Sequence, residues 1–171
     1  MKFSIIILFA MINSCIQKNP IDSIDHTKNI NNQIEIIKIL FLQKNAVKLA
    51  DVTYYKAEIE IGSKQKVIDT YTHLFKEMNS KGIDFHSISF GHHSVIFKEG
   101  EELQCTVPIK TILKKENLRV ETQSTIVLIS TDEGKNWAFI YSLNDVENES
   151  MYPKLNENIK IPKRIQNTYK E

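Results

Sequence analysis

The chain has little of what usually reveals function or topology. It contains two cysteines, and its 22 basic side chains are matched by 21 acidic ones, which leaves a net charge of +1. A chain so balanced has no overall attraction for nucleic acid or for an anionic membrane surface. Its one strongly apolar run, residues 3–12, is too short to cross a bilayer. There is no internal repeat and no change of composition, so the sequence predicts a single globular domain.

The apolar run has the form of a signal peptide. Met1 and Lys2 give it a basic start, and Ile12-Asn13-Ser14-Cys15 follows it. This ending resembles a bacterial lipobox, with an aliphatic residue at −3 and a small one at −1 before the cysteine. The resemblance implies that residues 1–14 are removed, that Cys15 carries acyl chains such as palmitate, and that the protein is anchored in the cell envelope, facing the periplasm or the exterior. The alternative is an ordinary secretory signal in which Cys15 is incidental.

The remaining sequence divides into a tether and a domain. Residues 15–27 are polar, contain Pro20, and predict a tether, whereas residues 28–171 have the size of one domain. With Cys15 lipidated, only Cys105 remains, so no internal disulfide is expected. Cys105 lies on the apolar side of a segment in which apolar and polar residues alternate. This position predicts that Cys105 is a small buried hydrophobic residue and not a nucleophile.

The stretch 101–142 predicts three long antiparallel strands joined by two tight turns. Apolar and polar residues alternate from Leu103, break at residues 114–117, and resume until Ile129. Near Val127 both faces of the second strand become apolar, so that end should be covered on both sides. The third strand carries Trp137, Phe139 and Tyr141 in alternation. Two shorter strands are expected before residue 101, at residues 84–90 and 95–97.

Three helices are expected before the sheet. The first ends near Lys44-Asn45, the second spans residues 46–52 with Asn45 as its cap, and the third spans residues 64–80 with Ser63 as its cap. Gly82 should end the third helix in the left-handed conformation. The side chains predicted to face inward are Ile30, Ile34, Ile36, Ile37, Leu40, Phe41, Val47, Ala50, Val67, Tyr71, Leu74, Phe75 and Met78. After Ser142 a polar tail is expected to pack Ile159 and Ile161 onto the domain.

The second turn of the sheet carries a recognisable motif. Ser130, Asp132, Gly134, Asn136 and Trp137 have the spacing S-x-D-x-G-x-N-W, which resembles the Asp-box hairpin of sialidase-type propellers. In such a turn the aspartate accepts backbone N–H groups, glycine takes a positive φ, and tryptophan packs over the hairpin. Propellers repeat the box in successive blades, whereas here it occurs once in a short chain. The motif therefore predicts a rigid structural hairpin and not a glycosidase.

The predicted order is an α+β arrangement: N-terminal helices packed on a curved antiparallel sheet of four to five strands. It resembles the nuclear transport factor 2-like superfamily (SnoaL-like, cystatin- or cone-like folds), and within it exported bacterial lipoproteins that carry the same hairpin. The resemblance covers residues 30–142. Its carriers are the step NAVKLADVTY at 45–54, the Gly62-Ser63-Lys64 break, the Lys81-Gly82 stop and the order of strands. It implies a sheet wrapped around a helix to form a pocket, but the superfamily includes enzymes and non-catalytic binders, so fold does not select function.

The candidate catalytic residues are few. Cone-fold enzymes project an acid/base pair into the pocket, and the resemblance would give that role to Asp51, Tyr54 or His73. Solvation at a helix end is the simpler interpretation of Asp51. His92 and His93 could bind metal together with His86, but no carboxylate or thiol stands at ligand spacing, which favours a solvated turn. No metal or cofactor is expected.

Three functional interpretations follow. The leading one is a non-enzymatic, lipid-anchored domain that binds a small apolar molecule or another envelope protein. The alternative is an enzyme of hydratase or isomerase type. The third is a homodimer formed through an open sheet face that exposes Val127, Ile129 and Ile140. The lysines at positions 110, 114 and 115 are expected at a solvated turn or edge that resists strand pairing, and no nucleic-acid partner is expected.

Overall fold

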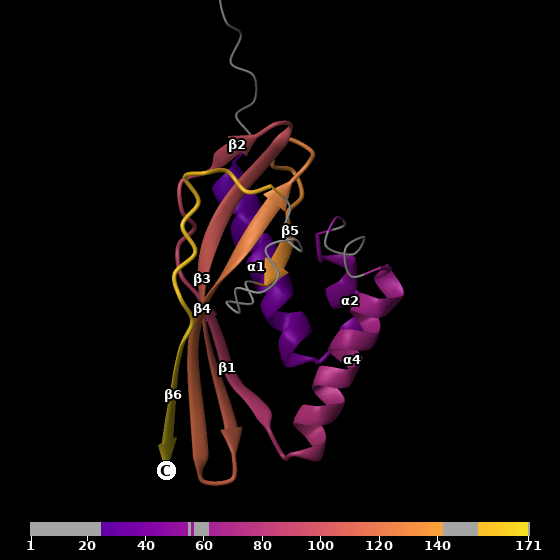
Figure 1. The fold of residues 1–171 in the computed structure, drawn as a ribbon, viewed down its shortest axis with the longest axis vertical. Coiled ribbons are helices and arrows are strands. Elements are labelled where there is room, and N and C mark those ends of the chain that lie inside the picture. Colours follow the sequence, from indigo (N-terminus) through magenta and orange to yellow (C-terminus); the bar gives the residue numbers. More distant parts are fainter. Residues whose placement is uncertain (1–24, 55, 57–61, 142–153, 171) are drawn as a thin grey trace, which may run out of the picture.

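The computed structural model describes residues 25–54, 56, 62–141 and 154–170, in which helices precede a curved antiparallel sheet (Figure 1). This confirms the α+β class. The predicted signal peptide and Cys15 lie outside the described residues. The helices are α1 (His26–Leu42), α2 (Ala46–Asp51) and α4 (Lys64–Ser80). The strands are β1 (Asp84–Phe90), β2 (Phe97–Glu99), β3 (Glu102–Lys115), β4 (Leu118–Ser130), β5 (Ala138–Tyr141) and β6 (Ile165–Lys170).

Each of these helices begins at a short polar side chain that accepts a backbone N–H of the first turn. Asn45 caps α2 and Ser63 caps α4, as predicted. Asp25 caps α1 and accepts the N–H of Lys28 at 3.0 Å. The first helix therefore begins at His26, inside the segment predicted as a tether, and the domain starts before residue 28. Gly82 ends α4 with φ +65°, as expected.

The inward faces agree with the predicted stripes except at three positions. Ile36, Val47 and Leu74 are 45%, 56% and 42% exposed, so their predicted inward orientation is wrong. In α1 the buried arc is centred on Ile30 and Ile37, and Ile36 lies 100° around the helix from Ile37, beyond the reach of the sheet. In α2 the core is reached by Leu49 and Ala50 instead of Val47.

The sheet is built on one long hairpin. β3 pairs with β4 from Leu103↔Ser130 to Lys115↔Leu118, and two strands in succession line each outer edge of this pair. β1 and β2 both pair with β3, whereas β5 and β6 both pair with β4. The described sheet therefore has six strands, not four or five, and it is not closed into a barrel. Lys114 and Lys115 end β3 beside the turn at residues 116–117, as expected. Because β3 is internal, the three lysines do not lie on an edge strand, and Lys110 forms an ion pair with Glu121 at 2.8 Å.

Two strand predictions need correction. The short strand expected at residues 95–97 is β2, which begins at Phe97 and ends at Glu99. β6 was not predicted, because its sequence IQNTYK has no apolar alternation and every one of its side chains is exposed. Pairing with residues 118–123 of β4, and not side-chain burial, holds it in the sheet.

Apolar side chains are buried on both faces of the sheet in the C-terminal part of β4. Ile126 and Leu128 join the larger core beneath α1 and α4, whereas Val127 and Ile129 join a second cluster on the opposite face. This confirms the two-sided burial predicted from the sequence. Tyr54, Ile140, Leu155 and Ile161 complete the second cluster. The prediction that Val127, Ile129 and Ile140 form an exposed dimer surface is therefore wrong. These three side chains are covered within the chain and at most 8% exposed.

Candidate functional site

Aromatic rings gather where α1 and α4 meet the sheet. Phe41 of α1 lies with its ring centroid 6.0–6.2 Å from four others, those of Tyr71, Phe85, Phe139 and Tyr141. Phe75 stacks on Tyr71 and meets Phe85 edge to face. The two phenylalanines Phe41 and Phe139 are buried, whereas Tyr71, Phe85 and Tyr141 are only half-buried. The cluster, named here the aromatic rim for its three half-buried members, thus begins in the core and ends at solvent.

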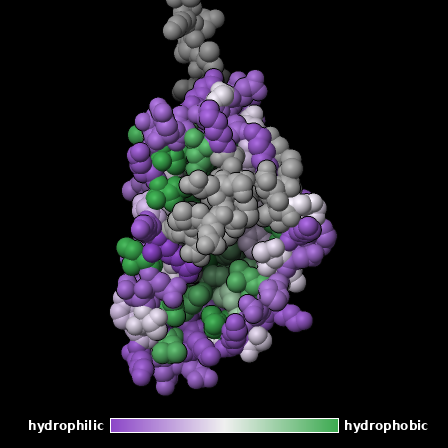
Figure 2. All heavy atoms as spheres, viewed as in Figure 1, coloured by the Kyte–Doolittle hydropathy of each residue, from purple (hydrophilic) through white to green (hydrophobic). Residues whose placement is uncertain are grey.

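The surface is hollowed between elements that carry the aromatic rim. Figure 2 shows hydrophobic residues gathered in a hollow in the lower half of the view, between the sheet and α4. On the same sheet face, Thr111 and Thr122 oppose each other in β3 and β4, and Ser124 donates to the Tyr141 hydroxyl at 3.2 Å. Burial raises the pKa of Tyr71, so its phenol stays neutral. Apolar walls with a few hydroxyl groups are the usual lining of a site for a small, mainly apolar ligand.

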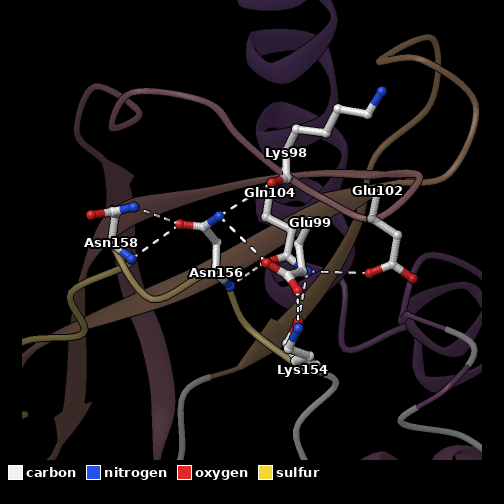
Figure 3. A network of polar contacts seen from close by, with 7 residues as sticks. All are labelled: Lys98, Glu99, Glu102, Gln104, Lys154, Asn156 and Asn158. Carbon is white, nitrogen blue, oxygen red and sulfur yellow. Dashed lines mark hydrogen bonds and ion pairs between the residues drawn. The ribbon is translucent and has the colours of Figure 1, made fainter.

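A second, polar feature lies on the opposite sheet face near β2. Gln104 is fully buried, and its amide nitrogen donates to the Lys154 carbonyl at 3.1 Å and to Glu102 at 3.2 Å (Figure 3). Its amide oxygen accepts the N–H of Asn156 at 3.0 Å. The alternation that begins at Leu103 predicts Gln104 on the polar, outward face of its strand. Instead, Gln104 fastens the tail, residues 154–162, over the second cluster.

The hydrogen bonds of Gln104 to the tail are named here the Gln104 clamp. Beside it, Tyr54 and Lys56 both contact Glu102. The Tyr54 hydroxyl donates to Glu102 at 2.5 Å, and the Lys56 ammonium lies 2.6 Å from the same carboxylate oxygen. Burial of Tyr54 and its hydrogen bond to Glu102 raise its pKa above the ordinary value. A cavity of about 390 Å³ opens here, lined by Lys56, Glu99, Gly100, Glu101, Glu102, Thr131 and Lys154. Two of its carboxylates pair with its lysines, Glu102 with Lys56 and Glu99 with Lys154, so the charges in this cavity largely neutralise one another.

The three candidate acid/base residues do not form one site. Asp51 is exposed at the end of α2, where it forms an ion pair with Lys64 at 2.5 Å. His73 is exposed on α4. Tyr54 packs in the second cluster and is held by Glu102.

The histidines and the cysteine have structural surroundings. His93 lies 3.2 Å from the Thr27 hydroxyl and 2.7 Å from the Ser94 carbonyl, whereas His86 and His92 are exposed. In the part of the chain that the structure describes, no group of three or more His, Cys, Asp or Glu residues could hold a metal ion. Cys105 is buried as predicted, and burial raises the pKa of its thiol to about 12.

The Asp-box hairpin has the contacts expected from its sequence. Asp132 accepts the Asn136 N–H at 2.9 Å, Gly134 has φ +84°, and the Trp137 indole donates to the Gly134 carbonyl at 3.1 Å. Ser130 accepts the Gly134 N–H at 2.9 Å. The hairpin also contacts the first turn of α1, because Asn29 donates to the Gly134 carbonyl at 2.9 Å. Its polar groups are thus used within the fold.

No family model matches the chain, and no curated protein is significantly similar to it. None of the described helices is long and apolar enough to span a membrane. Sequence reasoning missed both the aromatic rim as a unit and the Gln104 clamp. The rim combines residues from two helices and two strands, and periodicity within one element says nothing about which elements meet.

Proposed function

We propose that this chain is a lipid-anchored protein of the bacterial envelope whose domain binds a small, mainly apolar ligand without transforming it. The observation that carries the proposal is the aromatic rim, in which Tyr71, Phe85 and Tyr141 surround buried Phe41 and still reach solvent. Half-exposed rings offer a ligand large apolar contacts, and the Tyr141 hydroxyl offers it a polar partner. A cone-like arrangement related to the nuclear transport factor 2-like superfamily is part of this proposal.

Binding is favoured over catalysis by the positions of the candidate acid and base groups. A general base needs a pKa near the working pH, which an apolar site provides, and it must lie within hydrogen-bond reach of the substrate. Asp51 and His73 are exposed to solvent. The Tyr54 hydroxyl donates its hydrogen bond to Glu102, and the pKa of Tyr54 is raised further from neutrality. Members of the aromatic rim supply contact area and hydrogen bonds instead.

The ligand is tested by mass spectrometry of the protein purified gently from its native membrane. Native spectra should show a reproducible non-covalent mass of a few hundred daltons that disappears on denaturation. Tyr71→Ala should lower the occupied fraction several-fold because it removes one of the half-buried rings of the aromatic rim. Tyr169→Ala makes the same change in exposed β6 and should leave occupancy unchanged. A bare wild-type protein, or equal occupancy in both variants, would refute the proposed ligand.

The anchor is tested separately at Cys15. The wild-type chain should fractionate with membranes, and Cys15→Ser should release it, because the variant has no thiol to acylate. If the Cys15→Ser protein still partitions into detergent after its signal peptide has been removed, the lipid anchor is wrong. That result would leave the proposed ligand site intact.

A further inference from the structure

The second half of α1 is apolar on nearly every side. Residues 36–42 read IIKILFL, with Lys38 as the single polar residue. Three of their side chains, Ile37, Leu40 and Phe41, are buried in the core. Three others point away from it: Ile36, Ile39 and Leu42 are 45%, 47% and 42% exposed. A helix that is apolar all round is normally covered all round, so the outer side of this segment calls for a partner.

The three exposed residues of α1 form a continuous stripe. Ile36, Ile39 and Leu42 follow one another at intervals of three, a spacing that makes helical side chains surface neighbours. Val47, in α2 directly after α1, adds a fourth aliphatic side chain that is 56% exposed. We call these four residues the aliphatic stripe. Aliphatic side chains alone provide no directional contacts, which suits a fluid apolar phase better than a specific protein partner.

The charged residues within the segment that carries the stripe are lysines. Residues 36–48 include Lys38, Lys44 and Lys48 and no acidic residue. Lys38 pairs with Glu35, and Lys44 pairs with Asp84, so their charges are partly compensated, whereas Lys48 lies exposed one residue after Val47. Aliphatic residues flanked by lysines are the pattern of a helix that lies in a membrane interface, with its apolar face among acyl chains and its ammonium groups among phosphates.

The proposed anchor places the stripe within reach of a bilayer. Residues 16–24 separate Cys15 from Asp25, and nine residues extend at most about 30 Å. From His26, the helix rises roughly 20 Å to Ile39. The tether is therefore long enough for α1 to lie along the membrane that holds the acyl chains and short enough to keep it there. A second copy of the chain is a weaker occupant, because four half-exposed side chains supply only part of the roughly 800 Å² that each partner of a stable dimer buries.

We propose that the aliphatic stripe of Ile36, Ile39, Leu42 and Val47 docks on the lipid surface that holds Cys15. The anchor then does not leave the domain free to tumble on its tether: α1 lies on the membrane. The face of the sheet opposite α1 points away from the bilayer. This inference rests on the proposed lipid anchor and is independent of the proposed ligand.

Cysteine accessibility in native membranes tests it. In the lipidated protein Cys105 is buried and unreactive, so a single introduced cysteine reports its own site. Ile39→Cys probes the stripe, and Tyr169→Cys is the matched control, because both side chains are 47% exposed and Tyr169 lies in β6. With a membrane-impermeant maleimide, Ile39→Cys should react roughly tenfold more slowly than Tyr169→Cys in membranes, and equally fast when each is placed in the unlipidated Cys15→Ser protein in solution.

Each other result has a definite meaning. Equal labelling of the two cysteines in membranes would place the stripe in water and overturn the inference. Slow labelling of Ile39→Cys both in membranes and in the unlipidated Cys15→Ser protein would show that protein covers the stripe, which also overturns it. If the wild-type chain is not in the membrane fraction, the anchor is wrong and the inference falls with it. Fractionation and labelling therefore distinguish the two failures.

Discussion

At the scale of single residues, Gly134 combines two constraints. Its φ of +84° is unfavourable for any residue with a Cβ, and a Cβ built there would lie 2.1 Å from His26 Nδ1. Gly134→Ala should therefore lower the free energy of unfolding by about 2–4 kcal/mol, through backbone strain and displacement of the His26 ring. Gly100 is the control: its φ is +60°, nothing lies within 4 Å of its Cβ position, and Gly100→Ala should cost about 1 kcal/mol. Equal losses in urea unfolding would contradict the contact with α1.

Cys105 leads to a prediction about reactivity. Its side chain is fully buried, and burial raises its thiol pKa to about 12, so almost no thiolate exists near neutral pH. Iodoacetamide at pH 8 should not modify the folded protein, and modification should follow unfolding when urea is added. Cys15→Ser protein isolates this thiol for the measurement. Rapid alkylation without urea would show that the strand opens locally around Cys105.

At the scale of elements, Gln104 determines where the tail lies. Gln104→Ala leaves the Lys154 carbonyl and the Asn156 N–H without their partner, which should cost about 2–4 kcal/mol of unfolding free energy. The tail should then detach from Val127 and Ile129, and limited proteolysis should cut it faster.

The control for the clamp is Gln123→Ala, the same substitution at an exposed position on β4. It should change the unfolding free energy by no more than about 0.5 kcal/mol and leave proteolysis unchanged. If the two variants behave alike, Gln104 does not hold the tail, and the apolar contacts of Leu155 and Ile161 do so without it.

At the scale of the whole molecule, stability depends on pH through four of the carboxylates that the structure describes. Folding lowers the pKa of Asp84, Glu102, Glu121 and Asp132. For Glu102, burial opposes ionisation, but hydrogen bonds from Lys56, Tyr54 and Gln104 together with the Lys56 charge outweigh it. A pKa lowered by folding gives stability that is present above the unfolded-state pKa and is lost as the pH falls through the folded value. The free energy of unfolding should therefore be level above about pH 5.5 and fall steadily below about pH 4.5.

Glu102→Gln identifies the share of one carboxylate. The variant should be less stable than wild type at pH 7, where the Glu102 charge holds Lys56, and the difference should be smaller at pH 3, because protonation of Glu102 increases as the pH falls. Urea unfolding at the two pH values measures this. A difference of the same size at both would mean that Glu102 contributes through packing and not through its charge.

The sequence by itself determined the features that depend on neighbouring residues. The bounds of α4 and β1, the caps at Asn45 and Ser63, and the contacts of the Asp-box turn were readable because caps, alternation and turns involve residues a few positions apart. Two-sided burial at Val127 was readable for the same reason, since a strand apolar on both faces must be covered on both.

Only the tertiary structure decided what meets across the chain. The alternation within its own strand predicts that Gln104 faces outward, yet the tail segment that contains Asn156, 52 residues later, covers it. Ile36 looks inward by periodicity, yet the sheet does not extend to it. β6 has no apolar pattern at all and exists because β4 offers an open edge. In each case the stabilising partner is distant in sequence, and the orientation of a residue follows from which surfaces the fold brings together.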